Sequence, residues 1–297
     1  MKIISKAPTR NCLIGGGTDV NPYAAENQGA LINVSINLYC KVFLESRKSK
    51  LILVKALGEK REFLLDKKLS YGKDKKFDII RAVINHFRDK IPSGFNLEVS
   101  SKIPDSSGLG TSGSVEVALV GCFKRWLKQP INKDKIARLS FELESRELGW
   151  HTGKQDQWAA AFGGLNLMIF GPGEKVKVKP LKVSDKILKK LEKWIVLYYT
   201  GGKRSSSDIQ VNLKKGMSKE KRLEAFNKLK KITFQSVELF EKGNFQALGR
   251  LFDIGWQTKK MSNPLVTNKR LDQIYKKARE NGALGGKLIG AGGAGYY

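Results

Sequence analysis

The sequence predicts a mixed α and β fold of the α+β class, arranged in two lobes. Two observations lead to this expectation. Strand-like apolar patterns fill much of the first half of the chain, whereas apolar stripes at helical spacing dominate the second half. A chain of 297 residues can also bury a sizeable core, which two closely packed lobes would share.

Six stretches within the first 170 residues have the apolar pattern of strands. The longest keeps eight apolar residues on one face between Ala30 and Leu44, which is typical of a core strand. Two of the shorter ones should pair antiparallel across a turn at Gly58. The expected strands span residues 2–14, 30–44, 51–57, 61–65, 95–101 and 165–170.

Helices are expected wherever an apolar stripe recurs every three to four residues. These helices span residues 77–91, 115–126, 134–149, a short Ala-rich stretch from Gln155, 205–213, 219–242, 244–261 and 268–281. One more strand is expected at 194–200. A strand stops at Gly171-Pro-Gly173, so we place the domain boundary there, with an N-terminal domain at 1–172 and a C-terminal domain at 173–297.

The formal net charge is +27 and the isoelectric point is about 9.9. Such a charge suits a protein that binds nucleic acid or attracts polyanionic substrates. The lysines are spread along the chain, however, and no basic and aromatic stripe resembles a base-stacking platform. We therefore interpret the charge as a Lys-rich surface that weakly favours the binding of phosphate ligands. We expect no nucleic-acid partner.

Cysteine and histidine content argues against several kinds of site. The three cysteines form no metal or redox spacing and suit a reducing compartment, and only two histidines occur. No apolar run is long enough to cross a bilayer, and the amino end lacks a signal-peptide core. We expect a cytoplasmic protein with no membrane partner.

A glycine and hydroxyl loop at 102–114 follows a predicted strand and precedes a predicted helix. Gly108 and Gly110 allow backbone conformations closed to other residues. The start of the helix leaves N–H groups unpaired and presents a positive dipole end. Because a phosphate fits this environment, the loop is predicted to hold an anion.

Several classes of protein contain a glycine-rich loop of this kind. Gly108, Gly110 and Gly113 satisfy G-x-G-x-x-G, a pattern found in dinucleotide-binding folds and protein kinases. A dinucleotide fold needs a second strand soon after the helix, but residues 134–149 have a helical pattern. No protein-kinase catalytic loop follows, and no Lys precedes Thr111 as Walker A requires. A tight turn without a ligand is the remaining alternative.

Two further glycine segments stand out. Gly15-Gly-Gly-Thr-Asp19 suits close approach to a polyhydroxylated ligand, with Asp19 accepting hydroxyl hydrogen bonds, although a plain turn has the same composition. Near the carboxyl end, Gly285 to Gly295 would weaken an ordinary strand, so a backbone approach to a ligand or to another loop is expected.

Together the three segments resemble the three motifs of the GHMP small-molecule kinases. They are 7–19, 104–112 and 287–295, and their order and spacing cover nearly the whole chain. Within the family, 153–164 and 283–287 look like the sugar branch typified by heptose 7-phosphate kinases. The resemblance implies the two-lobed GHMP kinase fold. Since relatives continue through further strands after the last motif, the C-terminal lobe is expected to be truncated.

The resemblance implies transfer of the ATP γ-phosphoryl group to a sugar hydroxyl, with ATP and Mg²⁺ as cofactors. The expected acceptor is the C1 hydroxyl of D-glycero-D-manno-heptose 7-phosphate. Fucose, galactose, glucuronate and a mevalonate-like alcohol stay open as acceptors, and a basic nucleic-acid-binding protein or a ligand-sensing relative are the other classes. A homodimer is also left open.

Residue roles follow from the same resemblance. Asp156 matches the acid beside the acceptor hydroxyl, and Arg10 occupies the place of a cation that faces the phosphates. Glu144 matches the metal-binding glutamate and would share Mg²⁺ with Ser112, although a solvated helix face would also explain Glu144. His151 and Lys154 are sugar contacts or surface residues. Gly113 departs from the Ser often found there.

The remaining implied positions fall into three groups. ATP-binding residues are Pro104, Ser106, Ser107, Gly108, Leu109, Gly110, Thr111 and Ser112. Substrate-binding residues are Gly16, Gly17, Thr18 and Asp19. The structural glycine loop that supports the nucleotide loop comprises Gly290, Gly292 and Gly293.

Overall fold

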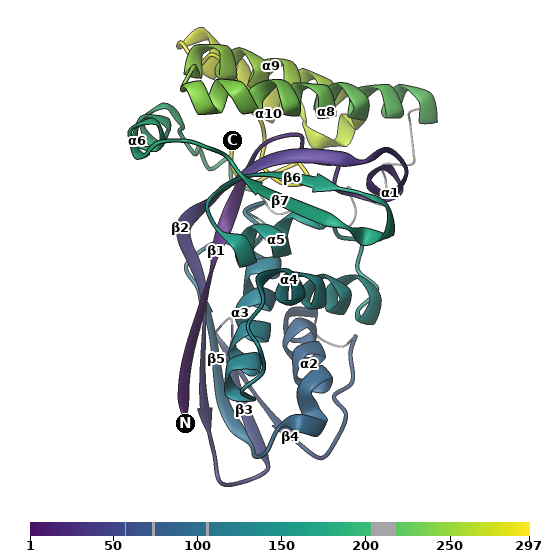
Figure 1. The fold of residues 1–297 in the computed structure, drawn as a ribbon, viewed down its shortest axis with the longest axis vertical. Helices are drawn as coiled ribbons and strands as arrows, with labels where there is room; N and C mark the ends of the chain where they lie inside the picture. Colours follow the sequence, from purple (N-terminus) through teal and green to yellow (C-terminus); the bar gives the residue numbers. More distant parts are fainter. Residues whose placement is uncertain (57, 73–74, 105–106, 203–217) are drawn as a thin grey trace.

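The computed structural model describes residues 1–56, 58–72, 75–104, 107–202 and 218–297 (Figure 1). Within them the strands form one seven-stranded sheet of order β4-β3-β5-β2-β6-β7, with β1 paired to β2. The β3–β5 pair is parallel and the other pairs are antiparallel. The strands are β1 (Lys2–Ile14), β2 (Gly29–Ser46), β3 (Leu51–Ala56), β4 (Glu59–Leu64), β5 (Phe95–Ser101), β6 (Leu165–Phe170) and β7 (Val176–Pro180).

Strand β2 organises this sheet. It pairs with β1 along nearly its whole length. On its other side the carboxyl half pairs with β5 from Cys40 onward, while the amino half pairs with β6 up to Val34. The five residues between these halves are in neither ladder, and they leave a gap in the sheet that another segment can fill.

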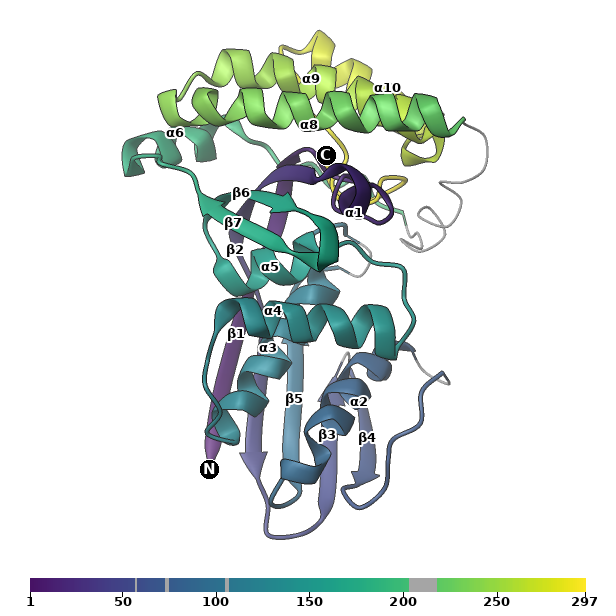
Figure 2. The same ribbon diagram turned by 45° about the vertical axis from the view of Figure 1, so that its right-hand side comes forward.

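The helices form two groups, which Figures 1 and 2 show at different ends of the molecule. Helices α2 to α5 lie beside the lower part of the sheet, and α8, α9 and α10 form a separate layer at the top. The α-helices of the described residues are α1 (Tyr23–Asn27), α2 (Lys75–Phe87), α3 (Thr111–Trp126), α4 (Lys133–Glu142), α5 (Gln155–Phe162), α6 (Asp185–Trp194), α8 (Lys219–Lys242), α9 (Phe245–Ser262) and α10 (Lys269–Glu280).

Two large cores correspond to the two groups of helices. In one, Phe77 of α2, Phe95 of β5 and Phe123 of α3 are fully or almost fully buried together. In the other, Ile32 of β2 packs with Phe240 and other apolar residues of α6, α8 and α9. Each such side chain contributes about 1.5–3 kcal/mol when buried. Strands β1 and β2 contribute to both cores, so they join the two regions.

Most of the predicted elements are confirmed, including all six strands predicted within the first 170 residues, the β3–β4 hairpin and helices α8, α9 and α10. The strand predicted at 194–200 is wrong. Helix α6 begins after the N-cap residue Ser184, whose side chain accepts from the Ile187 amide, and the helix ends at Trp194. Beyond it, Tyr199 forms an isolated β-bridge with Tyr296. The helix predicted at 205–213 lies outside the described residues.

The stop at Gly171-Pro-Gly173 is a short 3₁₀ turn rather than the end of the sheet. After it β7 pairs with β6, so the first sheet continues to Pro180. The division of the chain at residue 172 therefore falls between two paired strands, and the two-domain arrangement remains a prediction. The helix predicted at 134–149 is α-helical only to Glu142 and continues as a π-turn, Leu143–Glu147.

The C-terminal region is helix-rich, as predicted. Among its described residues after β7, strand pairing is limited to the Tyr199–Tyr296 bridge. Nowhere in the described parts of the chain is a helix both long and apolar enough to span a bilayer.

Candidate active site

The β1–β2 ladder is interrupted next to Arg10. The β1–β2 register shifts between Pro8 and Arg10, opposite the part of β2 that neither β5 nor β6 pairs with. The extra residues lie on β2, where residues 36–38 stand opposite Thr9 alone, and a bulge interrupts the ladder in this way. The freed Arg10 amide donates instead to the Leu109 carbonyl at 3.0 Å. The glycine loop is thus attached to the sheet at the residue whose side chain it surrounds.

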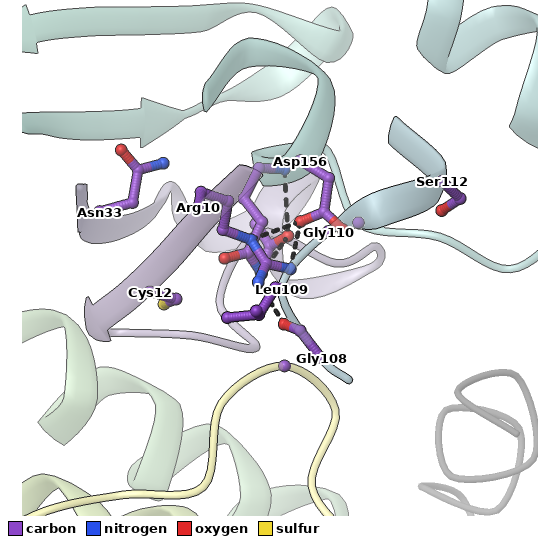
Figure 3. A network of polar contacts seen from close by, with 12 residues as sticks. Arg10, Cys12, Asn33, Gly108, Leu109, Gly110, Ser112 and Asp156 are labelled. Atoms are coloured by element: carbon purple, nitrogen blue, oxygen red, sulfur yellow. Dashed lines mark hydrogen bonds and ion pairs between the residues drawn. The ribbon is translucent and has the colours of Figure 1, made fainter. Parts of the chain in front are cut away.

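Arg10 and Asp156 form a buried ion pair (Figure 3). The guanidinium donates to Asp156 Oδ1 from Nε at 2.8 Å and from Nη2 at 2.5 Å, and Nη1 donates to the Gly108 carbonyl. The Arg10 side chain is 4 % exposed and that of Asp156 is 20 % exposed. Asp156 therefore keeps an open side, and the pair joins β1, the glycine loop and the first turn of α5.

The 108–113 loop needs its glycines because its backbone passes close to Arg10 and Asp156. Gly108 and Gly110 have φ values of +83° and +73°, which favour glycine. A Cβ on Gly110 would lie 3.1 Å from Asp156 Cγ and 3.3 Å from Arg10 Cζ, and one on Gly113 would lie 2.8 Å from Asp156 Cβ. The loop consequently holds the start of α3, with its unpaired N–H groups, directly against the ion pair.

Glu144 is buried rather than solvated. It is 5 % exposed in the π-turn after α4, so the solvated-face interpretation is wrong. The Ser112 hydroxyl donates to Oε1 at 3.3 Å, and Gln157 Nε2 donates to Oε2 at 2.5 Å. Burial, together with the nearby negative charge of Asp156, raises the pKa of Glu144 to about 7.

These oxygens fit a magnesium–nucleotide site. Mg²⁺ prefers oxygen ligands and is usually held by one or two carboxylates plus substrate phosphates. In the described residues no three His, Cys, Asp or Glu side chains are grouped to hold a metal ion. The buried Thr111 hydroxyl beside Ser112 also has no hydrogen-bond partner there. The site offers unused polar groups at the start of α3.

The 15–19 loop is tied to the same place through Asp19. The carboxylate accepts from the Gly17 amide at 3.2 Å and from the Gln155 amide at 3.4 Å, and it is 1 % exposed. Its burial, with a contribution from Asp156, raises the pKa of Asp19. Thr18 is fully buried, and its hydroxyl donates to the Ala30 carbonyl at 2.8 Å. These two side chains shape the loop next to α5.

The carboxyl-terminal glycine segment supports the glycine loop by apolar packing. Ile289 lies in one buried cluster with Ile103 and Leu109. Gly290, Gly292 and Gly293 all have positive φ, and a Cβ on Gly292 would lie 2.5 Å from Val266 Cβ. The Gly293 amide donates to the Val266 carbonyl at 2.8 Å. The segment is therefore anchored on the helical layer while its Ile289 reaches the loop.

The other expected positions are less central. Pro104 is exposed, and Ser106 lies outside the described residues. The Ser107 hydroxyl accepts from the Leu109 amide at 3.4 Å and so shapes the loop. His151 is exposed, whereas Lys154 is buried beneath the surface with its ammonium over the Phe141 ring.

Three residues of the site were not predicted from sequence. Gln157 fixes Glu144, Lys287 donates to the Cys12 carbonyl at 2.6 Å beside Gly16, and Glu116 is a fully buried carboxyl on α3. A signal existed for Glu116, because it follows Ser112 by four residues and so shares its helix face. Lys287 belongs to the segments 283–287 and 287–295 that resemble the family, but its proximity to Gly16 depends on the tertiary fold.

Comparison with known proteins identifies kinases among the proteins to which this chain is similar. The GHMP kinases N terminal domain matches residues 78–164 and the GHMP kinases C terminal matches residues 236–296. A D-glycero-alpha-D-manno-heptose 7-phosphate kinase of Campylobacter jejuni is 36% identical over 300 residues, covering 100% of this chain and 88% of the relative. A mevalonate kinase of Thermococcus gammatolerans is 28% identical over 316 residues, covering 99% and 88%.

Among solved structures, a D-glycero-D-manno-heptose 1-phosphate kinase from Bacteroides thetaiotaomicron superposes with a TM-score of 0.79. It is 32% identical, and the match covers 100% of this chain and 87% of that one. The full-length relatives include the segments that form the Arg10–Asp156 pair and the glycine loop, and the N-terminal family match includes the glycine loop and Asp156. The chain belongs to the GHMP kinase family.

Proposed function

We propose that this protein transfers the γ-phosphoryl group of ATP to the C1 hydroxyl of D-glycero-D-manno-heptose 7-phosphate, giving the 1,7-bisphosphate and ADP. The observation that carries the proposal is the Arg10–Asp156 pair held against the glycine loop at the start of α3. The names of the Campylobacter and Bacteroides relatives support a heptose phosphate as the acceptor.

Asp156 is the group that faces the acceptor in this proposal. Its carboxylate is the partly exposed member of the pair and sits at the first turn of α5. It orients the sugar hydroxyl and accepts its proton as the new P–O bond forms. The two guanidinium hydrogen bonds from Arg10 fix the carboxylate, and its positive charge counters charge on the transferred group.

The start of α3 would hold the ATP phosphates through the backbone N–H groups of 108–112. Ser112 and Glu144 would hold Mg²⁺, and Thr111 offers a further hydroxyl. When bound, the cation neutralises charge on the phosphates. The protein's own part is positioning: the Gly110 and Gly113 contacts leave no room for a side chain between this anion site and Asp156.

The sugar is proposed to bind beside Gly16 and Gly17. Their loop reaches Asp156 through the Asp19–Gln155 contact, so the acceptor and the acid would be placed by one connected unit. The ammonium of Lys287 lies 3.4 Å from where a Gly16 Cβ would be, which places a cation beside this loop for an anionic acceptor.

An acceptor panel tests the proposal. Protein is incubated with ATP, Mg²⁺ and each of heptose 7-phosphate, unphosphorylated heptose, fucose, galactose, glucuronate and mevalonate, and products are read by ³¹P NMR. We expect turnover with heptose 7-phosphate and a signal for a phosphate on C1. Phosphorylation of another acceptor with a higher kcat/KM would replace the acceptor, and no ATP-dependent turnover with any of them would contradict the kinase itself.

Mevalonate is the alternative acceptor with a specific observation in its favour, namely the mevalonate kinase relative that matches almost the whole chain. Its lower identity ranks it second. The cytoplasmic location, a homodimer and the lack of nucleic-acid binding stay predictions. Salt-dependent binding to random DNA without any phosphoryl transfer would instead favour a role for the +27 charge.

A further inference from the structure

One face of helix α8 packs against the 15–19 loop, a contact to which the proposed reaction gives no role. Four residues at helical spacing form this face, namely Phe226, Leu229, Lys230 and Thr233. Figures 1 and 2 show the amino-terminal part of α8 above α1, the short helix that follows the loop. A helix from the C-terminal region of the chain therefore covers the loop proposed to bind the sugar.

Two glycines of the loop bring its backbone directly onto α8. Gly15 and Gly17 have φ values of +82° and +103°. A Cβ on Gly15 would lie 2.4 Å from Thr233 Oγ1, and one on Gly17 would lie 3.6 Å from Phe226 Cε1. Thr233 is fully buried, and its hydroxyl donates to the Leu229 carbonyl at 2.9 Å. The shape of the loop is thus set against the side chains of this helix.

Helix α1 is fastened to the same face of α8. The Tyr23 hydroxyl donates to Asn227 Oδ1 at 2.9 Å, and the Lys230 ammonium donates to the Asn27 carbonyl at 2.8 Å. The rings of Tyr23 and Phe226 meet edge to face with their centroids 5.0 Å apart, and both are buried. A helix of five residues is too short to be stable alone, so the position of α1 depends on these contacts.

The two loops of the site rest on different supports. The 15–19 loop is held by α8 and, through the Asp19–Gln155 contact, by α5. The glycine loop at 108–112 is attached to Arg10 of β1 and packs on Ile289. Loss of packing on α8 should consequently displace the 15–19 loop and leave the glycine loop in place.

We propose that Phe226 is a positioning residue for the sugar acceptor: packed on Gly17 and Tyr23, it holds the 15–19 loop where the acceptor hydroxyl reaches Asp156. The inference rests on the proposed function, because it needs the sugar to bind beside Gly16 and Gly17. It assigns to α8 an effect on the acceptor and none on ATP. Displacement of a substrate-positioning element by about 1 Å costs on the order of 10²-fold.

Steady-state kinetics with each substrate varied in turn tests this. Phe226→Leu should lower kcat/KM for heptose 7-phosphate by about 10–100-fold, mainly through KM, and leave the KM for ATP within about twofold. Tyr23→Phe removes only the hydroxyl that binds Asn227 and should lower the same kcat/KM about fivefold, which covers the case in which Phe226→Leu does not fold. Phe234→Leu is the matched control on α8, because that ring is 43 % exposed, and it should change neither value.

Hydrogen exchange, followed by mass spectrometry without substrates, gives a second readout that does not need turnover. Amides of residues 15–27 should exchange at least about fivefold faster in Phe226→Leu than in the unaltered protein, and those of 108–112 should not change. Phe234→Leu should exchange like the unaltered protein in both segments.

Two results would overturn the inference. Equal rises in KM for ATP and for the acceptor in Phe226→Leu would mean that α8 stabilises the whole site, and an unchanged KM for the acceptor would remove the positioning role. The unaltered protein separates these from failure of the proposed function. If it phosphorylates no acceptor, the proposed function fails by itself, and exchange at 15–27 still decides whether Phe226 holds the loop.

Discussion

Two buried Arg–Asp pairs in this protein differ in what they connect. Arg81 and Asp78 lie one turn apart on α2, with Nη1 2.8 Å from Oδ1, and both side chains are almost fully buried. Arg10 and Asp156 are 146 residues apart and join three segments, and Asp156 is the more open of the two acids. In the first pair, Asp78 also accepts a hydrogen bond from the Gly72 amide. In the second pair, the Asp156 carboxylate remains partly accessible.

The difference shows how stability and reactivity are separated. Asp156 contributes to raising the pKa of Asp19, Glu116 and Glu144, so these neighbouring acids repel one another. Asp78, by contrast, pairs with Arg81 and accepts from the Gly72 amide. We infer that the Arg10–Asp156 pair serves catalysis and that the Arg81–Asp78 pair serves folding.

The largest expected effect comes from removing the two arginines in turn. Arg10→Met should lower kcat by about 10³-fold, because an arginine that stabilises charge on a transferred phosphoryl group contributes this much or more. Arg81→Met should leave kcat within about threefold for the folded fraction. Steady-state kinetics at saturating ATP and acceptor measures kcat for both variants. Comparable losses of kcat would contradict the inference that only the Arg10–Asp156 pair serves catalysis.

The second test concerns folding. Asp78→Asn leaves Arg81 without its charged partner and should lower the free energy of unfolding by about 3 kcal/mol. Asp156→Asn should change it by less than about 1 kcal/mol, because relief of repulsion among the acids offsets the weakened contact to Arg10. Urea unfolding of both variants provides the values. A larger loss for Asp156→Asn would mean that its pair is structural.

A third test uses two glycines of similar conformation. Gly110 and Gly58 have φ values of +73° and +80°, but an added Cβ meets the ion pair at Gly110 and nothing within 4 Å at Gly58. Alanine costs each site about 1 kcal/mol of backbone strain. Gly110→Ala should also reduce kcat by about 10²-fold, since displacement near the reacting groups has that effect. Equal activity in both variants would show that the loop does not set the geometry.

The smallest effect is a pH dependence of the metal-free protein. Burial raises the folded-state pKa of Glu144 from 4.5 to about 7, so between these values the folded state binds more protons than the unfolded state. Stability contributed by this proton is present at low pH and declines, on the order of 1–3 kcal/mol, as pH rises toward 7. Unfolding of Glu144→Gln should lack this decline, and an identical profile in both proteins would refute the assignment.

Much of the fold was predictable because periodicity reports burial. The β2 pattern from Ala30 to Leu44 and the stripes of α8 to α10 depend on local spacing alone. Helix α6 was missed since its lysines obscure a short stripe at Ile187, Leu188 and Leu191, and the apolar run after it resembled a strand. Its capping serine, Ser184, was the overlooked signal.

The candidate site also has features that the sequence predicts and features that depend on the tertiary fold. Motif resemblance identified Arg10, Ser112, Glu144 and Asp156, and the structure brings them together. It could not show that the β1–β2 ladder is interrupted beside Arg10, or that the π-turn buries Glu144 against Gln157. Those depend on segments far apart in the sequence, which periodicity does not link.

One measurement tests the central claim most directly, namely ³¹P NMR of product formation by Asp156→Asn beside Asp78→Asn, with ATP binding measured on both. Asp156→Asn should bind ATP normally and form product at least about 10²–10⁴-fold more slowly, whereas folded Asp78→Asn should turn over like the unaltered protein. Undiminished product formation by Asp156→Asn would contradict the account.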